Sequence, residues 1–373
     1  MAEQHDRFEQ GKAHFLRGLD HYQAGEFAAA EQSYRASLEL VPVRASTLIN
    51  LAATQLRLAR STDALASADA ALAVEGDSTD AWLHRGTALA QLGRAAQALA
   101  AFDRLLELDP AHTAAWSSRG SLLREMQRPH DAAQAFRRAL QLGAQADLHH
   151  YYLASVGAGA QPPTAPEAYV VRLFDDYAAE FEQHLVGELN YQAHRQLVQR
   201  LTRVAGAASY ASALDLGCGT GLCGPLVRPM VQRLSGVDLS ARMLDKARAL
   251  GTYDRLDHAD VVQFMRAAED NEDNFDLLLA ADVFIYVGDL QPVFEGARRV
   301  MARGVFCFSV ELAPDSGPGF QLLPSLRYAH SRCYLLQLAA AHGFELLAME
   351  QGPVRQDQRE PVDGLYVYLR RSA

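Results

Sequence analysis

Residues 213–226 read ALDLGCGTGLCGPL and place a cluster of glycines directly after a short apolar run. Gly219, Gly221 and Gly224 satisfy the pattern G-x-G-x-x-G, in which a tight turn brings backbone N–H groups close to a bound phosphate. By itself this pattern fits a dinucleotide site, another cofactor site or a simple turn. The acidic residues near the loop must decide among these alternatives.

Two aspartates lie near the loop. Asp215 immediately precedes the glycines, and Asp238, within GVDLS, ends the next apolar run. A carboxylate at position 215 would repel a pyrophosphate but would attract the cationic ammonium and sulfonium groups of S-adenosylmethionine. A carboxylate at position 238 can accept hydrogen bonds from both ribose hydroxyls, a role that the two cofactor classes share. The pair therefore favours S-adenosylmethionine over a dinucleotide.

LDLGCGTG followed by GVDLSARMLDKAR resembles the motifs of class I S-adenosylmethionine-dependent methyltransferases, and the similarity covers about residues 170–370. The resemblance implies S-adenosylmethionine as cofactor and S-adenosylhomocysteine as product. It assigns the methionine moiety to the glycine loop, the ribose to the second aspartate and the adenine to later positions. In chain order, the implied cofactor residues are Asp215, Gly217, Cys218, Gly219, Gly221, Asp238, Leu239, Met243, Asp260, Val261 and Asp282. Val283 and Tyr286 of AADVFIYV would lie with Asp282 at the mouth of the active site.

The acceptor end is predicted from PSLRYAHSRCY, residues 324–334, which occupies the substrate-facing position in that family. His330 is the expected general base for an oxygen or nitrogen nucleophile, with Arg327 and Tyr328 available for an anionic or polar substrate. The alternative is that His330 and Ser331 begin a helix, with Ser331 as its cap. His184 is a weaker candidate base.

The nature of the acceptor stays open. ADVF stands where a methylase of amide or adenine nitrogens would carry an Asn-Pro-Pro-Tyr-like run, which leaves small molecules, carboxylates and protein side chains. The segment RLFDDYAAEFEQHL resembles the helix that lies over the cofactor pocket in bacterial methyltransferases with N-terminal repeats. This resemblance makes Tyr177 a lid contact, although a simple packing role fits it equally well.

The elements that must position these residues follow from the pattern beyond Ser209, where short apolar runs alternate with helical stretches. Such alternation predicts a mainly parallel sheet with helices on both faces and a ligand beyond the carboxyl ends of the strands. We therefore expect a Rossmann-like α/β methyltransferase domain with a seven-stranded sheet over 169–373.

The N-terminal half is a repeat array. Small residues recur at a 34-residue interval, at Gly18, Ala52, Gly86 and Gly120, and several other columns keep the same phase. The pattern resembles the tetratricopeptide repeat (TPR) and predicts an all-α solenoid over 1–156. It would hold four repeats at about 11–144, a capping helix at 147–157 and a linker at 157–168. The resemblance implies a protein- or peptide-binding groove on the face formed by the first helix of each pair.

Composition limits the other functions. The formal net charge is -10, and no basic cluster is longer than a pair, which argues against nucleic acid as the main partner. The N-terminus does not read as a signal peptide, no apolar run could span a membrane, and the four cysteines form no metal-binding pattern. We expect a cytoplasmic methyltransferase without a metal whose repeats recruit a polypeptide substrate or carrier. The alternatives are a small-molecule enzyme whose repeats oligomerise or tether it, and a non-catalytic scaffold that binds the cofactor.

Overall fold

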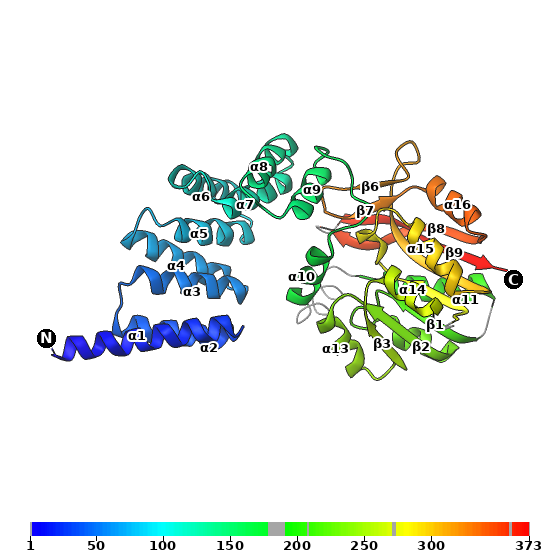
Figure 1. Ribbon diagram of the computed structural model, residues 1–373, viewed down its shortest axis with the longest axis horizontal. Coiled ribbons are helices and arrows are strands. Elements are labelled where there is room, and N and C mark those ends of the chain that lie inside the picture. The colour runs from blue at the N-terminus through cyan, green and yellow to red at the C-terminus, as the bar shows by residue number, and fades with distance from the viewer. Residues whose placement is uncertain (1, 178–190, 207–208, 271–273, 358–359, 373) are drawn as a thin grey trace. The chain divides into compact units, whose positions relative to one another are not determined.

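The computed structural model describes residues 2–177, 191–206, 209–270, 274–357 and 360–372. The chain divides into two compact units, residues 1–159 and 160–373, and each is described by itself. The first unit is helical and the second is built on a β-sheet, as the ribbon shows (Figure 1). In the described part of the chain, no helix has the length and apolar character needed to cross a membrane.

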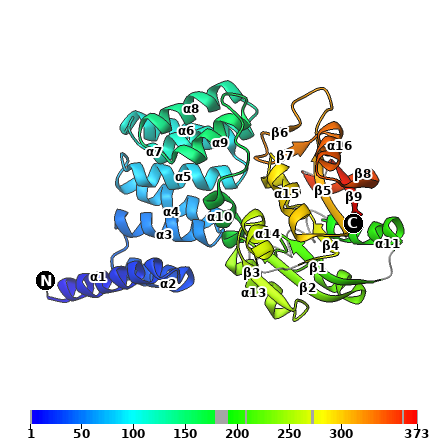
Figure 2. The same ribbon diagram turned by 45° about the vertical axis from the view of Figure 1, so that its right-hand side comes forward.

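The first unit consists of antiparallel helix pairs that stack on one another (Figure 2). In chain order the helices are α1 (Ala2–Gln23), α2 (Phe27–Leu40), α3 (Ala45–Arg57), α4 (Ser61–Val74), α5 (Thr79–Gln91), α6 (Ala95–Leu108), α7 (Thr113–Glu125), α8 (Pro129–Gln141) and α9 (Ala146–Ser155). These helices form four pairs and a single last helix, and the all-α repeat fold agrees with the sequence prediction.

The 34-residue columns have distinct physical causes. A Cβ atom built on Gly86 or Gly120 would lie 2.5 Å from a ring carbon of Phe102 or Phe136, so only glycine lets the two helices of a pair approach this closely. The column of Gly25 and Gly93 lies in the turn between the two helices, where φ is +77° and +70°. Glycine adopts this left-handed conformation without steric cost, which ends the first helix of the pair.

The second unit carries a sheet of nine described strands, two more than predicted. They are β1 (Tyr210–Leu216), β2 (Val231–Asp238), β3 (Arg255–His258), β4 (Leu277–Ala280), β5 (Gly304–Leu312), β6 (Phe320–Leu322), β7 (Tyr328–His330), β8 (Glu345–Asp357) and β9 (Glu360–Arg371). The order is β3-β2-β1-β4-β5-β7-β6, and β9 pairs antiparallel with both β5 and β8. The two additional strands are β6 and β7, a short antiparallel pair that the sequence pattern did not indicate.

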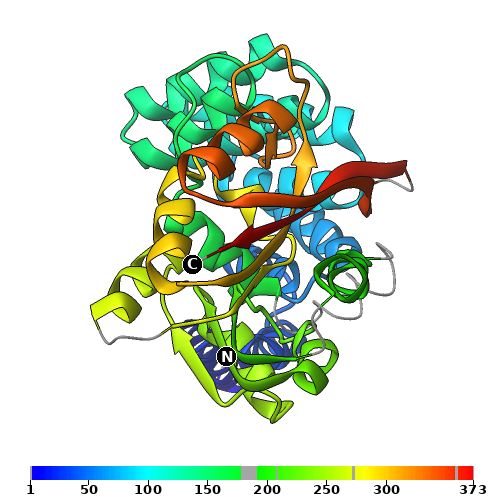
Figure 3. The same ribbon diagram turned by 90° about the vertical axis from the view of Figure 1, so that its right-hand side faces the viewer.

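Side chains of the central strands alternate between two cores. Phe306 and Phe308 of β5 belong to one core, with α14 (Val261–Asp270), α15 (Gln291–Val300) and α16 (Arg332–Ala341). Val305 and Cys307 belong to the other, with α11 (Ala193–Ala205) and α12 (Gly224–Val227). Figure 3 shows the long strands β8 and β9 running along the sheet. Two buried faces explain why the strands read as continuous apolar runs.

Part of the segment expected as a linker packs onto the sheet unit. The carbonyl oxygen of Pro163 accepts 2.8 Å hydrogen bonds from the backbone N–H groups of Gly288 and Asp289. The Tyr328 hydroxyl donates a 2.8 Å bond to the carbonyl oxygen of Pro162. These residues belong to the second unit and lead into α10 (Glu167–Tyr177).

Candidate functional site

The strand order reverses at β1, which lies between β2 and β4. In an open α/β sheet, ligands bind at such a reversal, outside the carboxyl ends of the strands. A cavity of about 590 Å³ lies there, a volume typical of small-molecule sites. Ten of the twelve predicted cofactor residues line it: Asp215, Gly217, Cys218, Gly219, Asp238, Leu239, Met243, Asp260, Val261 and Asp282.

Of the other two predicted cofactor residues, only Gly221 has surroundings that the structure describes. Gly221 turns the loop at φ +90° and packs against Leu250 and Tyr253, so its place is in the wall of the turn. Tyr177 is the last residue of α10, and its side chain lies outside the described part of the structure. His184 also lies outside the described residues.

The glycine loop needs glycine for two separate reasons. At Gly217, φ is +64° and an added Cβ would lie 2.6 Å from a methyl group of Val283. At Gly219, φ is +56°, yet an added Cβ would meet nothing within 4 Å. Gly217 therefore permits the close packing of the loop on the β4 end, while Gly219 leaves open space on the cavity side where a ligand can approach the backbone.

Asp215 is the most deeply buried acid of the cavity wall, with 2% of its surface exposed. Burial raises the pKa of its carboxyl to about 7, against the hydrogen bond from Tyr253, while the nearby charge of Asp238 raises it further. The Tyr253 hydroxyl donates that bond at 2.6 Å to Oδ2. A buried, half-protonated carboxyl is costly to ionise until a cation arrives to balance it.

Backbone N–H groups donate hydrogen bonds to the carboxylates of Asp238 and Asp260 and fix their positions. Oδ2 of Asp238 accepts a 2.8 Å bond from Gly219 N–H, and Oδ1 accepts a 2.8 Å bond from Ser240 N–H. Burial nevertheless raises the pKa of Asp238 above its ordinary value, because these two bonds lower it less than burial raises it. Oδ1 of Asp260 accepts bonds from the Val262 and Gln263 N–H groups at the start of α14, which fixes the direction of the carboxylate.

The three predicted catalytic residues occupy different places. Arg327 lines the cavity, whereas Tyr328 and His330 are fully buried in β7 and are absent from its lining. The His330 Nε2–H donates to the carbonyl oxygens of Val287 and Gly288, both at 3.0 Å. Burial lowers the pKa of His330 to about 4, against those bonds. Ser331 is the N-cap of α16, where its Oγ accepts a 3.2 Å bond from Tyr334 N–H.

The sequence patterns missed an ion cluster in the cavity wall. Arg355 of β8 is 3% exposed; its guanidinium pairs with Glu311 of β5 and lies 3.4 Å from Asp282 Oδ1. Asp282 has φ +61°, a rare conformation for a non-glycine residue, and its N–H donates to Ser309 Oγ at 2.9 Å. Arg327 also lines this end, so two cations and one carboxylate face the cavity beyond the loop.

Burial and neighbouring charges shift the pKa values of Arg327 and Glu311 at this end of the cavity. Burial lowers the pKa of Arg327, but Tyr286, Asp282 and Glu311 together raise it above its ordinary value. Burial raises the pKa of Glu311, against the charge and hydrogen bond of Arg355. Tyr191 and His194 complete the wall with stacked rings whose centroids are 5.1 Å apart. Among the described residues, no three metal-ligating side chains gather into a cluster.

Comparison with protein families matches both parts of the chain. A methyltransferase domain model matches residues 214–307, and a tetratricopeptide repeat model matches residues 49–113. The first match covers the glycine loop, Asp238, Asp260 and Asp282. The second covers parts of the helical array, in agreement with the 34-residue period.

Two curated proteins and one solved structure illustrate the similarity. Methyltransferase-like protein 27 from Homo sapiens is 40% identical over 91 residues, 24% of this chain and 37% of that protein. Malonyl-[acyl-carrier protein] O-methyltransferase from Enterobacter lignolyticus (strain SCF1) is 30% identical over 168 residues, 45% of this chain and 60% of that protein. The chain thus spans less than two thirds of the length of each. Magnesium protoporphyrin IX methyltransferase from Synechocystis PCC 6803, with bound SAH, has 14% identity and a TM-score of 0.44, and the match covers 55% of this chain and 99% of that chain.

Proposed function

We propose that this chain, a methyltransferase domain preceded by tetratricopeptide repeats, transfers the methyl group of S-adenosylmethionine to an acceptor bound beside Asp282. The observation that carries the proposal is the pair of aspartates, Asp215 and Asp238, converging on a glycine loop that leaves open space at Gly219. The donor set fits this cofactor, because it supplies acids for the cationic groups and for the ribose.

Different residues would bind the different parts of the cofactor. Asp215 would hold the ammonium group, and Asp238 would accept the ribose hydroxyls with the lone pairs that its two backbone donors leave free. Asp260 would accept the adenine amino group, while Leu239, Met243 and Val261 would pack on the ring. Bound in this way, S-adenosylmethionine supplies an electrophilic methyl carbon on a sulfonium sulfur.

The acceptor would lie against Asp282, Tyr286, Arg327 and Arg355. Arg327 favours an acceptor that carries an anionic or strongly polar group, because a guanidinium can donate to a carboxylate in a fixed geometry, whereas Arg355 is already paired with Glu311. The protein's contribution is to align the nucleophile with the methyl carbon and to exclude water from the cavity. We assign Tyr328 and His330 a structural role, because the Tyr328 hydroxyl and the His330 Nε2–H donate to backbone carbonyls and neither residue lines the cavity.

The repeats would bring a polypeptide, either the substrate or a carrier that presents it, to the enzyme in the cytoplasm. TPR repeats are solenoids whose stacked helices form extended binding surfaces. This role goes with the methyltransferase activity and is tested separately from it.

Calorimetry with S-adenosylmethionine, S-adenosylhomocysteine and NAD tests the cofactor assignment. We expect both adenosyl compounds to bind and NAD to give no heat. Binding of NAD alone would overturn the proposal. Transfer is tested by incubating the protein with methyl-labelled cofactor and host extract, then separating polypeptides from small molecules. Label in polypeptides supports a protein acceptor, and label only in small molecules contradicts it.

A further inference from the structure

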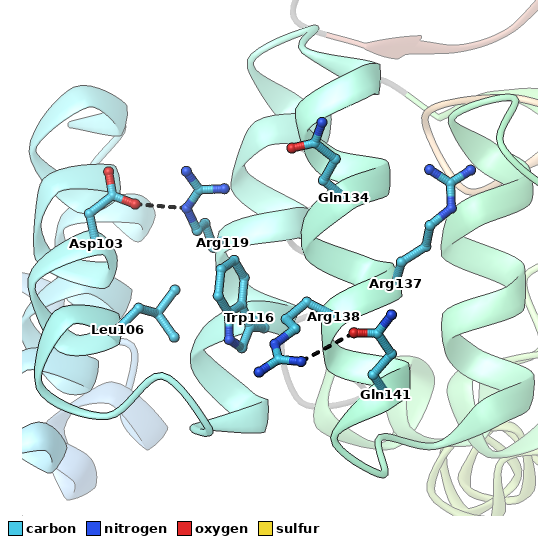
Figure 4. A pocket seen from close by; sticks show the side chains of 8 residues that line it. All are labelled: Asp103, Leu106, Trp116, Arg119, Gln134, Arg137, Arg138 and Gln141. Carbon is cyan, nitrogen blue, oxygen red and sulfur yellow. Dashed lines mark hydrogen bonds and ion pairs between the residues drawn. The ribbon is translucent and has the colours of Figure 1, made fainter.

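The helical unit contains a second cavity, of about 520 Å³, that the methyltransferase chemistry does not use. It lies between α6 and α8, the second helices of two successive pairs, with Trp116 and Arg119 of α7 between them (Figure 4). It is therefore formed largely by the second helices, whereas the expected groove is formed by the first helices of the pairs. Arg119 and Arg138 lie on either side of the Trp116 ring in this view.

The central contacts of this cavity recur in the preceding repeat. The Arg119 Nε–H donates to Asp103 at 2.7 Å, and its guanidinium lies 5.8 Å from the centre of the Trp116 ring. One repeat earlier, Arg85 makes the same 2.7 Å bond to Asp69 and lies 5.5 Å from the Trp82 ring. The Nε1–H of each tryptophan donates a 3.0 Å bond to a backbone carbonyl. These contacts thus belong to the repeat scaffold. Any difference in function between the two repeats must come from the residues around them on the second helix of each pair, here called the rim.

The rim differs in charge between the two repeats. In the earlier repeat the rim carries Asp103, Arg104 and Glu107, and Arg104 forms a 2.8 Å ion pair with Glu107. Exactly 34 residues later, the same positions are Arg137, Arg138 and Gln141. Arg138 now bonds to the neutral Gln141 at 3.2 Å, and Arg137 bonds to the carbonyl of Ala158. Neither charge is balanced by these partners, so the residues that line this cavity include three arginines and a single aspartate, with the Arg137 guanidinium directed to the Ala158 carbonyl.

We propose that the groove at Trp116, lined by Arg119, Arg137 and Arg138, is a docking site for an acidic polypeptide segment. A chain with a net charge of -10 that concentrates unbalanced arginines beside a tryptophan has a local field opposite to its overall charge. Such a site attracts carboxylates and lets the aromatic ring contact their aliphatic parts. The proposal rests on the proposed function in one respect, since the docked segment would be the substrate or its carrier.

The two tryptophans of the chain provide a matched test, because Trp116 lines the cavity and Trp82 occupies the equivalent position one repeat earlier. In the full-length Trp82→Phe variant only Trp116 emits, and in Trp116→Phe only Trp82 emits. We expect an octapeptide of alternating glutamate and aspartate to change the Trp116 emission saturably, with an affinity that falls as salt is added. The Trp82 emission should stay unchanged, and a lysine octapeptide should change neither.

Two pairs of substitutions locate the site. The double variant Arg137→Asp with Gln141→Glu gives the rim the residues that the previous repeat already carries, and we expect it to weaken binding of the acidic octapeptide about fivefold or more. Arg138→Gln should weaken it measurably, whereas Arg104→Gln, the equivalent change one repeat earlier, should not. Equal effects of the last two, or equal binding of the acidic and lysine peptides, would overturn the proposal.

The same preparations separate this inference from the proposed function. Binding of S-adenosylmethionine, measured by calorimetry, should be the same in all these variants, because none of the substituted residues lies in the cofactor cavity. If the cofactor does not bind while the acidic peptide does, the proposed function fails and the docking site stands. If the cofactor binds and the acidic peptide does not, the docking site alone fails.

Discussion

Asp238 Oδ2 accepts a 2.8 Å hydrogen bond from the backbone N–H of Gly219, which joins the end of β2 to the glycine loop that follows β1. Its other oxygen accepts the N–H of Ser240, the N-cap of α13 (Ala241–Ala249). One carboxylate therefore fixes both the loop and the helix start. It also keeps lone pairs on the cavity side for a ligand.

Replacing this carboxylate by an amide should weaken cofactor binding more than it weakens the fold. In Asp238→Asn the amide NH2 must face one of the two backbone donors, and the negative charge is lost. We expect the affinity for S-adenosylmethionine to fall at least about tenfold in calorimetry, the equivalent of about 1.4 kcal/mol. Asp245→Asn, on the exposed face of α13, is the control and should bind like the wild type. Equal affinities of both variants would remove Asp238 from the site.

The raised pKa of Asp215 predicts a pH dependence of cofactor binding. A cationic ligand needs the ionised carboxylate, so below pH 7 binding must release a proton. We expect the association constant to rise about tenfold between pH 5.5 and 7 and then to level off, as measured by calorimetry in buffers of different ionisation heat. Without ligand, the stability of the folded state depends on pH in the opposite direction. The folded state retains the proton where the unfolded state does not, so stability declines as pH rises from about 4 to about 7.

Two variants check that Asp215 is the group responsible. Asp215→Asn should weaken binding and flatten its pH profile. Tyr253→Phe removes the hydrogen bond that lowers the pKa of Asp215, so the rise should move to higher pH. A profile that is unchanged in both variants would assign the titration to another group.

The glycines of the loop should respond differently to an added methyl group. Gly217→Ala combines a left-handed φ with a Cβ only 2.6 Å from Val283, so we expect a loss of about 3 kcal/mol or more. Gly219→Ala has the same backbone strain but open space, and should cost about 1–2 kcal/mol. Hydrogen exchange of peptides from β1 and β4 measures both. In Gly219→Ala the methyl group fills ligand space, so cofactor binding should be lost even though the sheet persists.

The cofactor end of the site was predictable because its residues are contiguous in the chain. Asp215 lies near the end of β1, directly before the glycine loop, and Asp238 ends the next strand, so the sequence pattern also indicates their spatial relation. The same holds for the repeats, where a fixed period reports a fixed packing, as between Gly120 and Phe136.

The proposed acceptor end was not predictable in this way. Glu311 and Arg355 come from β5 and β8, 44 residues apart, and the pair forms only because β9 bridges the two strands. No pattern of residues that are close in sequence indicates such a contact. The His330 hypothesis relied on position along the chain, and the short strand β7 turns that histidine into the interior of the unit instead.

The buried pair of Glu311 and Arg355 should be strongly coupled. Glu311→Ala leaves a 97% buried guanidinium with only the longer contact to Asp282, and we expect it to destabilise the sheet unit by about 3–5 kcal/mol. The double variant Glu311→Ala with Arg355→Met removes the stranded charge, so its cost should be smaller than that of the single change. Hydrogen exchange of β5 and β9 peptides gives the cost of the double variant and of each single change, Glu311→Ala and Arg355→Met. Costs that simply add would mean that the two side chains stabilise the sheet independently.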